Sequence, residues 1–276
     1  MTALVNGRET ESLPVADRGL QYGDGLFETI ALHNGKPLLW ERHLQRLTEG
    51  CQRLGMAPPD GLLLRQELDQ IGGNKLRAVA KIILTRGISS RGYRPEEAGS
   101  VTRILQCLAW PASPENAAHD GVAVRWCATR LARQPRLAGL KHLNRLEQVL
   151  ARAEWDDPAI AEGLMLDEKD QVIEATAANV FVVRDGAVLT PTLHECGVAG
   201  VMRALIMELA QSAGMPVREC ALSLDAARGA QEIFLTNSVI GVWPVRELDT
   251  IVKSIGPTTR RIATLLEQSC PAYAYP

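Results

Sequence analysis

The segment LAGLKHLNRLEQVLARAEW, residues 137–155, places one lysine between an apolar approach and a helical pattern. Residues 137–140 are apolar or small, so Lys141 is expected to emerge from buried chain. Beyond it, apolar residues at steps of three and four predict one face of an amphipathic helix: Leu143, Leu146, Val149, Leu150 and Ala153. A desolvated lysine has a lowered pKa and becomes available as a nucleophile. The alternative is a solvated surface lysine, which is the more frequent situation for a single lysine.

The composition of the 276-residue chain is that of an ordinary globular protein. It is 46% hydrophobic and 22% charged, which allows a large core and two domains. A formal net charge of -2 gives no signature of nucleic-acid binding. No apolar run approaches about 18 residues, so no membrane-spanning helix is expected. The start, MTALVNGRETESL, has charged residues and no long apolar stretch, so we expect no signal peptide and a cytoplasmic location.

The cysteines and histidines are scattered along the chain, which argues against a metal site. No two of the six cysteines have CxxC spacing, and the five histidines form no HExxH motif. We therefore expect no metal. In a reducing compartment, the cysteines are expected to be buried as small apolar residues: Cys51, Cys107, Cys127, Cys196, Cys220 and Cys270.

The first 110 residues alternate between strand and helix patterns. A short strand is expected at residues 3–7, and two strands within residues 23–39 flank a turn at Asn34 and Gly35. Apolar residues at helical spacing predict a helix over residues 40–56, which Pro58 and Pro59 terminate. A second helix is expected over residues 62–71, and strands over residues 78–87 and 102–110.

The segment PASPENAAHDG, residues 111–121, is rich in proline and alanine and lacks periodicity, so it is the predicted linker. A strand is expected after it at residues 122–130, followed by several short strands within residues 161–191. A helix over residues 200–214 and a strand pair over residues 232–245 follow. The predicted fold class is α+β, with an N-terminal domain (1–110), the linker (111–121) and a C-terminal domain (122–276).

Six segments, in order, resemble the fold-type IV enzymes that depend on pyridoxal 5'-phosphate (PLP), such as branched-chain and D-amino acid aminotransferases and 4-amino-4-deoxychorismate lyases. They are ADRGLQYGDGLFET at 16–29, TRGISSRGY at 85–93, LAGLKHLNRLEQV at 137–149, EATAANVFVV at 174–183, GVAGVMR at 197–203 and TNSVIGVWPV at 236–245. The resemblance covers the whole chain. It implies a two-domain fold with a smaller N-terminal α/β domain and a larger C-terminal pseudo-barrel domain that binds PLP.

The resemblance also implies roles for single residues. Lys141 would hold PLP as a Schiff base and then transfer protons, and Glu174 would pair with the pyridine nitrogen. Taken without the resemblance, Glu174 is equally a turn carboxylate, and Arg46 is a helix-surface arginine. Contacts to the phosphate or the edge of PLP are implied for residues of one helix, a helix N-terminus and two turns: Arg46, Asn179, Val201, Met202, Asn237 and Ser238.

Within the family, the residues around Lys141 most resemble those of 4-amino-4-deoxychorismate lyase. That resemblance implies conversion of 4-amino-4-deoxychorismate to 4-aminobenzoate and pyruvate, a step of folate biosynthesis, by Schiff-base formation, proton abstraction and β-elimination. Contacts to this substrate are implied for residues before and within the 85–93 segment: Thr29, His33, Arg91 and Tyr93. Arginine suits a substrate with two carboxylates because it can bind a carboxylate through two parallel hydrogen bonds.

Alternatives remain open from the sequence. The first is a D-amino acid or branched-chain aminotransferase of the same fold. A partner-binding protein of this fold without catalysis is a second alternative, although Lys141 and Glu174 are both present. The family also implies a homodimer, with no nucleic-acid or membrane partner.

Overall fold

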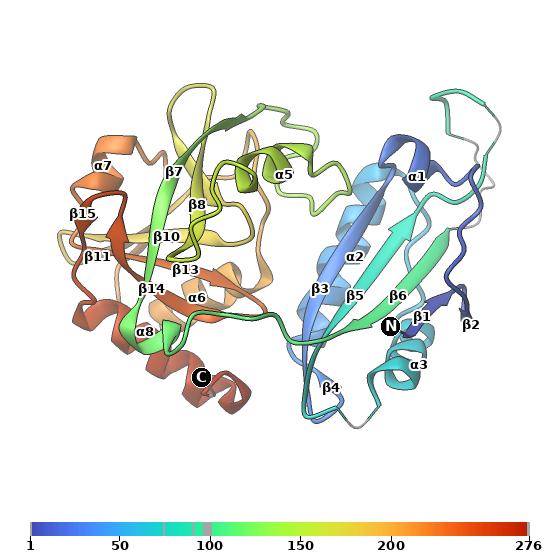
Figure 1. Cartoon of the computed structure of the whole chain (residues 1–276), viewed down its shortest axis with the longest axis horizontal. Helices are drawn as coiled ribbons and strands as arrows, with labels where there is room; N and C mark the ends of the chain where they lie inside the picture. The colour runs from blue at the N-terminus through green and yellow to red at the C-terminus, as the bar shows by residue number, and fades with distance from the viewer. Residues whose placement is uncertain (1, 74, 90, 96–100, 275–276) are drawn as a thin grey trace. The chain divides into compact units, whose positions relative to one another are not determined.

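The structure is a computed structural model that describes residues 2–73, 75–89, 91–95 and 101–274 (Figure 1). The chain forms two compact units. Unit 1 comprises Met1–Pro111 and Leu140–Asn144, and unit 2 comprises Ala112–Gly139 and Arg145–Pro276. Residues 140–144 therefore pack with unit 1, although the chain before and after them belongs to unit 2. The domain boundaries drawn from the sequence stay a prediction.

Unit 1 is built on a six-stranded sheet in the order β2-β1-β6-β5-β3-β4. Neighbouring strands are antiparallel, and β3 pairs with β5 along its full length. Asn34 and Gly35 both have positive φ and close the predicted turn between β3 and β4. The strands are β1 (Thr2–Val5), β2 (Arg8–Glu9), β3 (Gly25–His33), β4 (Lys36–Pro37), β5 (Arg77–Thr85) and β6 (Thr102–Leu108).

The helices of unit 1 are α1 (Arg18–Tyr22), α2 (Trp40–Leu54) and α3 (Gly61–Gly72). The predicted helix over residues 40–56 is thus present, and Gly55 ends it in the left-handed conformation. Asp60 caps α3 because its carboxylate accepts hydrogen bonds from the amides of Leu62 and Leu63. α2 packs on β3, and α3 packs on β1, β5 and β6, so both helices cover the sheet of unit 1.

Unit 2 is built on a nine-stranded mixed sheet that curls into half of a barrel. Its order is β12-β11-β10-β13-β14-β7-β8-β9, and β15 pairs with β14. β7 is parallel to both of its neighbours, β14 and β8. The strands are β7 (Val122–Leu131), β8 (Ile160–Asp167), β9 (Val172–Ala175), β10 (Asn179–Arg184), β11 (Ala187–Pro191), β12 (Val217–Cys220), β13 (Glu232–Asn237), β14 (Gly241–Leu248) and β15 (Ile251–Val252).

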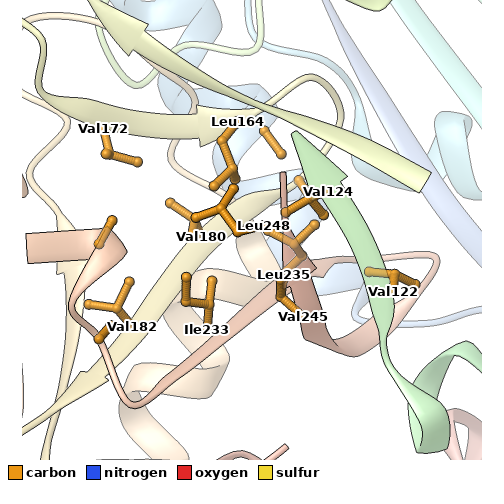
Figure 2. Packing of buried hydrophobic residues seen from close by; sticks show 14 of the residues in the cluster. Val122, Val124, Leu164, Val172, Val180, Val182, Ile233, Leu235, Val245 and Leu248 are labelled. Atoms are coloured by element: carbon orange, nitrogen blue, oxygen red, sulfur yellow. The ribbon is translucent and has the colours of Figure 1, made fainter. Parts of the chain in front are cut away.

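Apolar side chains from several strands meet in the main core of unit 2 (Figure 2). Val180 and Val182 of β10 lie beside Ile233 and Leu235 of β13, since alternate residues of a strand point to the same face. Val172 of β9 belongs to the same cluster. The core therefore holds in place β9 and β10, the strands that carry Glu174 and Asn179.

The helices of unit 2 are α4 (Ala117–Asp120), α5 (Leu146–Arg152), α6 (Val201–Ser212), α7 (Leu224–Arg228), α8 (Pro257–Ser269) and the 3-10 helix η1 (Pro271–Tyr273). Glu232 caps α8, because its carboxylate accepts a hydrogen bond of 2.7 Å from the amide of Thr259. Both helices have a glycine at the N-cap, Gly200 in α6 and Gly256 in α8, so the carboxylate of Glu232 is what distinguishes the start of α8.

The helix predicted after Lys141 is present as α5, but its apolar stripe faces outward. Leu146, Val149 and Leu150 are 75%, 59% and 61% exposed. The buried residues of α5 are Gln148 and Ala151 instead.

Polar contacts explain this orientation of α5. The side-chain amide of Gln148 donates a 3.3 Å hydrogen bond to Glu174, and the carboxylate of Glu147 accepts one of 2.8 Å from the amide of Ala132. A buried amide or carboxylate needs such partners, so these bonds decide which side of a short helix turns inward.

The α+β fold class and the family architecture predicted from the sequence are confirmed. All six cysteines are free, and burial is confirmed for Cys51, Cys107, Cys127 and Cys196. Within the part of the chain that the structure describes, no helix is both long and apolar enough to cross a membrane.

Candidate functional site

Lys141 lies at the edge of β3, in a segment that extends the sheet of unit 1. The amide of Phe27 donates a 2.9 Å hydrogen bond to the carbonyl of Lys141, and the amide of Leu143 donates one of 3.0 Å to Gly25. This pairing places Lys141 opposite Phe27, and the Nζ atom lies 4.3 Å from the centre of the Phe27 ring. Thr29 shares this face of β3, because side chains alternate along a strand.

The other face of β3 carries a buried carboxylate that the sequence analysis did not identify. Glu28, 1% exposed, forms an ion pair with Arg46 of α2 through both carboxylate oxygens. His43, one turn earlier on α2, places its Nδ1 atom 2.6 Å from Glu28. Arg46, predicted to bind phosphate, is thus anchored by Glu28.

The charges in this cluster are set by their mutual contacts. Burial alone would raise the pKa of Glu28, but the charge of Arg46 and the hydrogen bond from His43 outweigh it and lower that pKa to about 2. Burial lowers the pKa of His43, and the positive charges of Arg46 and Lys141 lower it further against the opposing effect of Glu28. Glu28 is therefore ionised and His43 neutral near pH 7, so the Nδ1 atom of His43 carries the proton that Glu28 accepts.

The loop after β5 carries two further predicted residues. Arg91 and Tyr93 both have exposed side chains, and Gly92 between them has φ +116°. The Tyr93 ring lies 5.5 Å from the ring of Tyr22 in α1. Ser90, within the same sequence motif, lies outside the described residues.

In unit 2, Glu174 lies on β9 and is 4% exposed. Its carboxylate accepts a 2.8 Å hydrogen bond from the amide of Val198 and the 3.3 Å bond from Gln148. Burial lowers the pKa of Arg145, while the negative charges of Glu174 and Glu147 raise it, so Arg145 contributes positive charge nearby. The carboxylate of Glu174 is thus fixed in direction by the segment before α6.

That segment also approaches Asn179 closely. The side-chain amide of Asn179 donates a 2.8 Å hydrogen bond to the carbonyl of Val198. A Cβ atom added to Gly200 would lie 2.0 Å from the Oδ1 atom of Asn179, so only glycine fits there. The first amides of a helix have no partner within it, and the uncapped start of α6 at Val201 and Met202 offers such amides to an anion.

The TNS turn between β13 and β14 is held by its own side chain. The amide of Asn237 donates a 2.9 Å hydrogen bond to the carbonyl of Ala177, and its Oδ1 atom accepts bonds from Val239 and Ile240. Ser238 is 8% exposed, and its carbonyl accepts a 2.9 Å hydrogen bond from Tyr273. Cofactor contacts from Asn237 and Ser238 stay a prediction.

Each unit thus gathers part of the predicted set. In unit 1, Lys141 lies against Phe27, with Thr29 on the same strand face; in unit 2, Glu174 and Asn179 converge on Val198. His33 lies at the far end of β3 from Phe27, beside Lys36 in the hairpin. The predicted roles of these residues stay predictions.

The sequence contained a signal for the missed residue Glu28. Glu28 lies two residues from both Leu26 and Ile30, which are buried against α2. Because side chains alternate along a strand, this spacing alone places the charge of Glu28 on the apolar face. A buried carboxylate requires a basic partner, and His43 and Arg46, three residues apart on the next helix, form such a pair.

Taken together, these groups supply an amine, a buried carboxylate and unpaired helix amides. An amine can form an imine with an aldehyde, a carboxylate can hold a protonated heterocycle, and helix amides bind phosphate.

Comparison with known proteins agrees with this chemistry. The model of the amino-transferase class IV family matches residues 25–248. The aminodeoxychorismate lyase of Vibrio harveyi is 38% identical over 265 residues, which cover 94% of this chain and 97% of that protein. The structure of 4-amino-4-deoxychorismate lyase from Pseudomonas aeruginosa has a TM-score of 0.92 and 50% identity, covering 97% of this chain and 99% of that one. The branched-chain amino acid aminotransferase of Escherichia coli has a TM-score of 0.83 and 25% identity, covering 95% and 91%.

Proposed function

Since this chain belongs to the class IV aminotransferase family, we propose that it is a PLP-dependent lyase that converts 4-amino-4-deoxychorismate to 4-aminobenzoate and pyruvate. The family is PLP-dependent. The observation that carries the proposal is the 50% identity to the lyase of Pseudomonas aeruginosa over 97% of this chain. Lys141 and Glu174, which the chemistry requires, are both present.

The donor set fits PLP. The close approach of Gly200 to Asn179 leaves no room for a side chain at the uncapped start of α6, as a phosphate site requires. The amides of Val201 and Met202, with Arg46, would hold the phosphate. Glu174 would hold the pyridine nitrogen, and Lys141 would bond to the aldehyde carbon.

When bound, PLP supplies an electron sink next to the carbon that bears the substrate amine. Lys141 then has two tasks. It holds the cofactor before substrate arrives, and its free amine afterwards takes the proton from that carbon. Glu174 keeps a proton on the pyridine nitrogen, because a carboxylate fixed by the amide of Val198 favours a positive charge beside it.

The conversion of the substrate is an elimination and requires no oxidant. The C–H bond at the amine-bearing carbon breaks, its electron pair forms a ring double bond, and the neighbouring C–O bond breaks to release enolpyruvate. One proton converts the leaving group to pyruvate, and Thr29, on the Phe27 face of β3, is a candidate donor. Arg91 and Tyr93 would hold the carboxylates of the substrate, with His33 as a further contact.

We also propose a homodimer and a cytoplasmic location. The exposed apolar stripe of Leu146, Val149 and Leu150 on α5 supports a covering second copy of the chain, since contiguous exposed apolar side chains are uncommon on monomers. Light scattering should then give twice the chain mass of 30.1 kDa. The six free cysteines agree with a reducing compartment.

The test of the lyase is a product assay on the PLP-loaded protein. 4-Amino-4-deoxychorismate alone should yield 4-aminobenzoate and pyruvate in equal amounts, with no 2-oxo acid added. The similarity to the aminotransferase of Escherichia coli favours transamination as a second candidate. Incubation with D-alanine or a branched-chain amino acid and 2-oxoglutarate tests it, and rapid glutamate formation without 4-aminobenzoate would replace the lyase by an aminotransferase.

A further inference from the structure

Arg18, at the start of α1, is a buried arginine whose contacts converge on the loop after β5. It is 3% exposed. Its guanidinium donates hydrogen bonds to the carbonyl oxygens of Gly92 at 2.9 Å and Tyr93 at 3.0 Å, and to the hydroxyl of Ser89 at 3.1 Å. The Nε atom donates a fourth, of 2.8 Å, to Asp24.

Further contacts attach the same loop to the segment around Arg18. The backbone amide of Arg18 donates a 2.8 Å hydrogen bond to the carbonyl of Gly87, and Asp17 forms a β-bridge with Ile88. The ring of Tyr22 lies between the two parts, 4.9 Å from the Arg18 guanidinium and 5.5 Å from the Tyr93 ring. We call residues 87–89 and 91–93 the pinned loop.

The pinned loop combines a fixed backbone with exposed side chains. Arg91 and Tyr93 project into solvent although the carbonyls at Gly92 and Tyr93 are hydrogen-bonded to a buried cation. A loop that served only to connect β5 to β6 would not need a buried arginine, since burying a charge is costly unless it is fully paired. Fixing exposed side chains in advance lowers the entropy lost when they bind a ligand.

Arg18 and Arg86 both bind Asp24, but their other hydrogen bonds go to different parts of the chain. Burial would raise the pKa of Asp24, but hydrogen bonds from Arg86 and Arg18 outweigh it and lower that pKa. The Arg86 side chain also donates two hydrogen bonds to Asp24, of 2.8 and 3.1 Å, but its other two go to the carbonyls of Leu54 and Gly55 at the end of α2. Arg86 is therefore a partly buried arginine that shares Asp24 with Arg18 but does not contact the pinned loop in these hydrogen bonds.

We propose that Arg18 is a positioning residue for substrate capture, which holds the pinned loop so that Arg91 meets a carboxylate of the substrate. This inference rests on the proposed function. Arg18 acts through the backbone at Gly92 and Tyr93 and does not touch the substrate itself. The planar fork of arginine suits these contacts, because Arg18 donates to four acceptors from three separate nitrogens, whereas lysine has three donors on a single nitrogen.

The first experiment measures the loop without reference to catalysis. Trypsin cuts after Arg91 only when the loop opens, so its cleavage rate in the PLP-loaded protein reports on local opening. Arg18→Lys should raise that rate about tenfold or more, since three charge-assisted hydrogen bonds to the loop are lost. Arg86→Lys is the control and should leave cleavage after Arg91 within about twofold of the unchanged protein. Equal cleavage in both variants would overturn the proposal.

The second experiment measures whether the loop serves substrate binding. Arg18→Lys should raise KM for 4-amino-4-deoxychorismate about tenfold and change kcat less, with the PLP absorbance band retained. Combined with Arg91→Ala, it should raise KM by less than about twofold beyond Arg91→Ala alone, because Arg18 acts through Arg91. If the double variant instead raises KM by the product of the two single-variant factors, the proposal is overturned and Arg18 is a general structural residue.

A milder variant covers the case in which Arg18→Lys fails to fold. Ser89→Ala removes the 3.1 Å contact with Arg18 from the loop side and leaves Arg18 in place, so it should shift cleavage and KM in the same direction by a smaller factor. No shift in either measurement would overturn the proposal. If the unchanged protein forms no 4-aminobenzoate, the proposed function fails, whereas the trypsin comparison still decides whether Arg18 holds the loop.

Discussion

Glu28 and Glu174 are buried carboxylates on strands, one in each unit, yet their partners differ. Glu28 is ion-paired with Arg46 and lies 2.6 Å from the Nδ1 atom of His43. Glu174 accepts hydrogen bonds from two neutral groups, the amide of Val198 and the side chain of Gln148, and the positive charge of Arg145 also acts on it. Burial alone therefore does not identify which carboxylate is able to bind a cofactor.

The difference lies in what each charge is able to do. A carboxylate paired with an arginine through both oxygens has its charge matched inside the fold, and it mainly orients that arginine. A carboxylate oriented by neutral donors keeps more of its potential for a cationic ligand. We therefore expect Glu28 to govern stability and Glu174 to govern chemistry.

The largest effect is expected from Lys141→Ala, because without the amine Glu174 has no covalently held cofactor on which to act. Turnover should fall by about a thousandfold or more, and the absorbance band of bound PLP should disappear. Lys81→Ala is the control, since the Lys81 Nζ atom also lies over Phe27, at 5.5 Å, and its loss should leave the band in place. A full lyase rate in Lys141→Ala would refute the proposed mechanism.

Glu28→Gln should come next, as a loss of stability. It leaves the partly buried Arg46 without its carboxylate, which costs on the order of 3 kcal/mol of the free energy of unfolding. Chemical denaturation of the PLP-free protein measures it. Glu174→Gln is the matched comparison and should lose much less stability; if the two variants lose the same amount, the division between the carboxylates is wrong.

The dependence of stability on acidic pH also tests the ion pair of Glu28. The pKa of Glu28 is about 2 in the folded protein against 4.5 for an ordinary glutamate, so its ionised form stabilises the fold above pH 4.5. That stability is lost as the pH falls from 4.5 towards 2. Glu28→Gln should therefore flatten part of the decline in that range, and an unchanged acid profile would contradict the ionised pair.

Glu174→Gln is expected to lower turnover about a hundredfold while the protein still binds PLP. Glutamine keeps an oxygen that can accept the hydrogen bond from Val198 but has no charge to hold a proton on the pyridine nitrogen. Steady-state rates and the PLP absorbance band, recorded together, separate lost chemistry from lost cofactor. An unchanged rate would remove Glu174 from its proposed role.

The smallest effect is expected from Gly200→Ala. The added methyl group would meet the Oδ1 atom of Asn179 at 2.0 Å and displace the start of α6, so PLP affinity should fall about tenfold. Gly229→Ala is the control, because its Cβ atom would lie 3.2 Å from the carbonyl of Asp225, away from α6. Titration of the PLP-free variants with PLP compares them, and equal affinities would argue against a phosphate site at α6.

Local patterns predicted the elements well but not their tertiary partners. The turn at Asn34 and Gly35 and the helix that became α2 follow from short-range preferences, and both are present. The side-chain partners of Arg18 in the loop after β5 lie 71 to 75 residues away in the chain, a separation on which local preferences carry no information. The apolar stripe of α5 is exposed within the single chain, because Gln148 and Ala151 face inward and Gln148 bonds Glu174, a partner that apolar periodicity does not reveal.

The assignment of Leu140–Asn144 to unit 1 has a consequence for how this protein can evolve. The chain first passes from unit 1 to unit 2 after Pro111. A gene divided at that point would encode Lys141 in the fragment that lacks its neighbour Phe27. Neither half is thus a transferable module. Recombination that exchanges one half between relatives must take the lysine segment and β3 from the same parent, or Lys141 loses the strand with which it pairs.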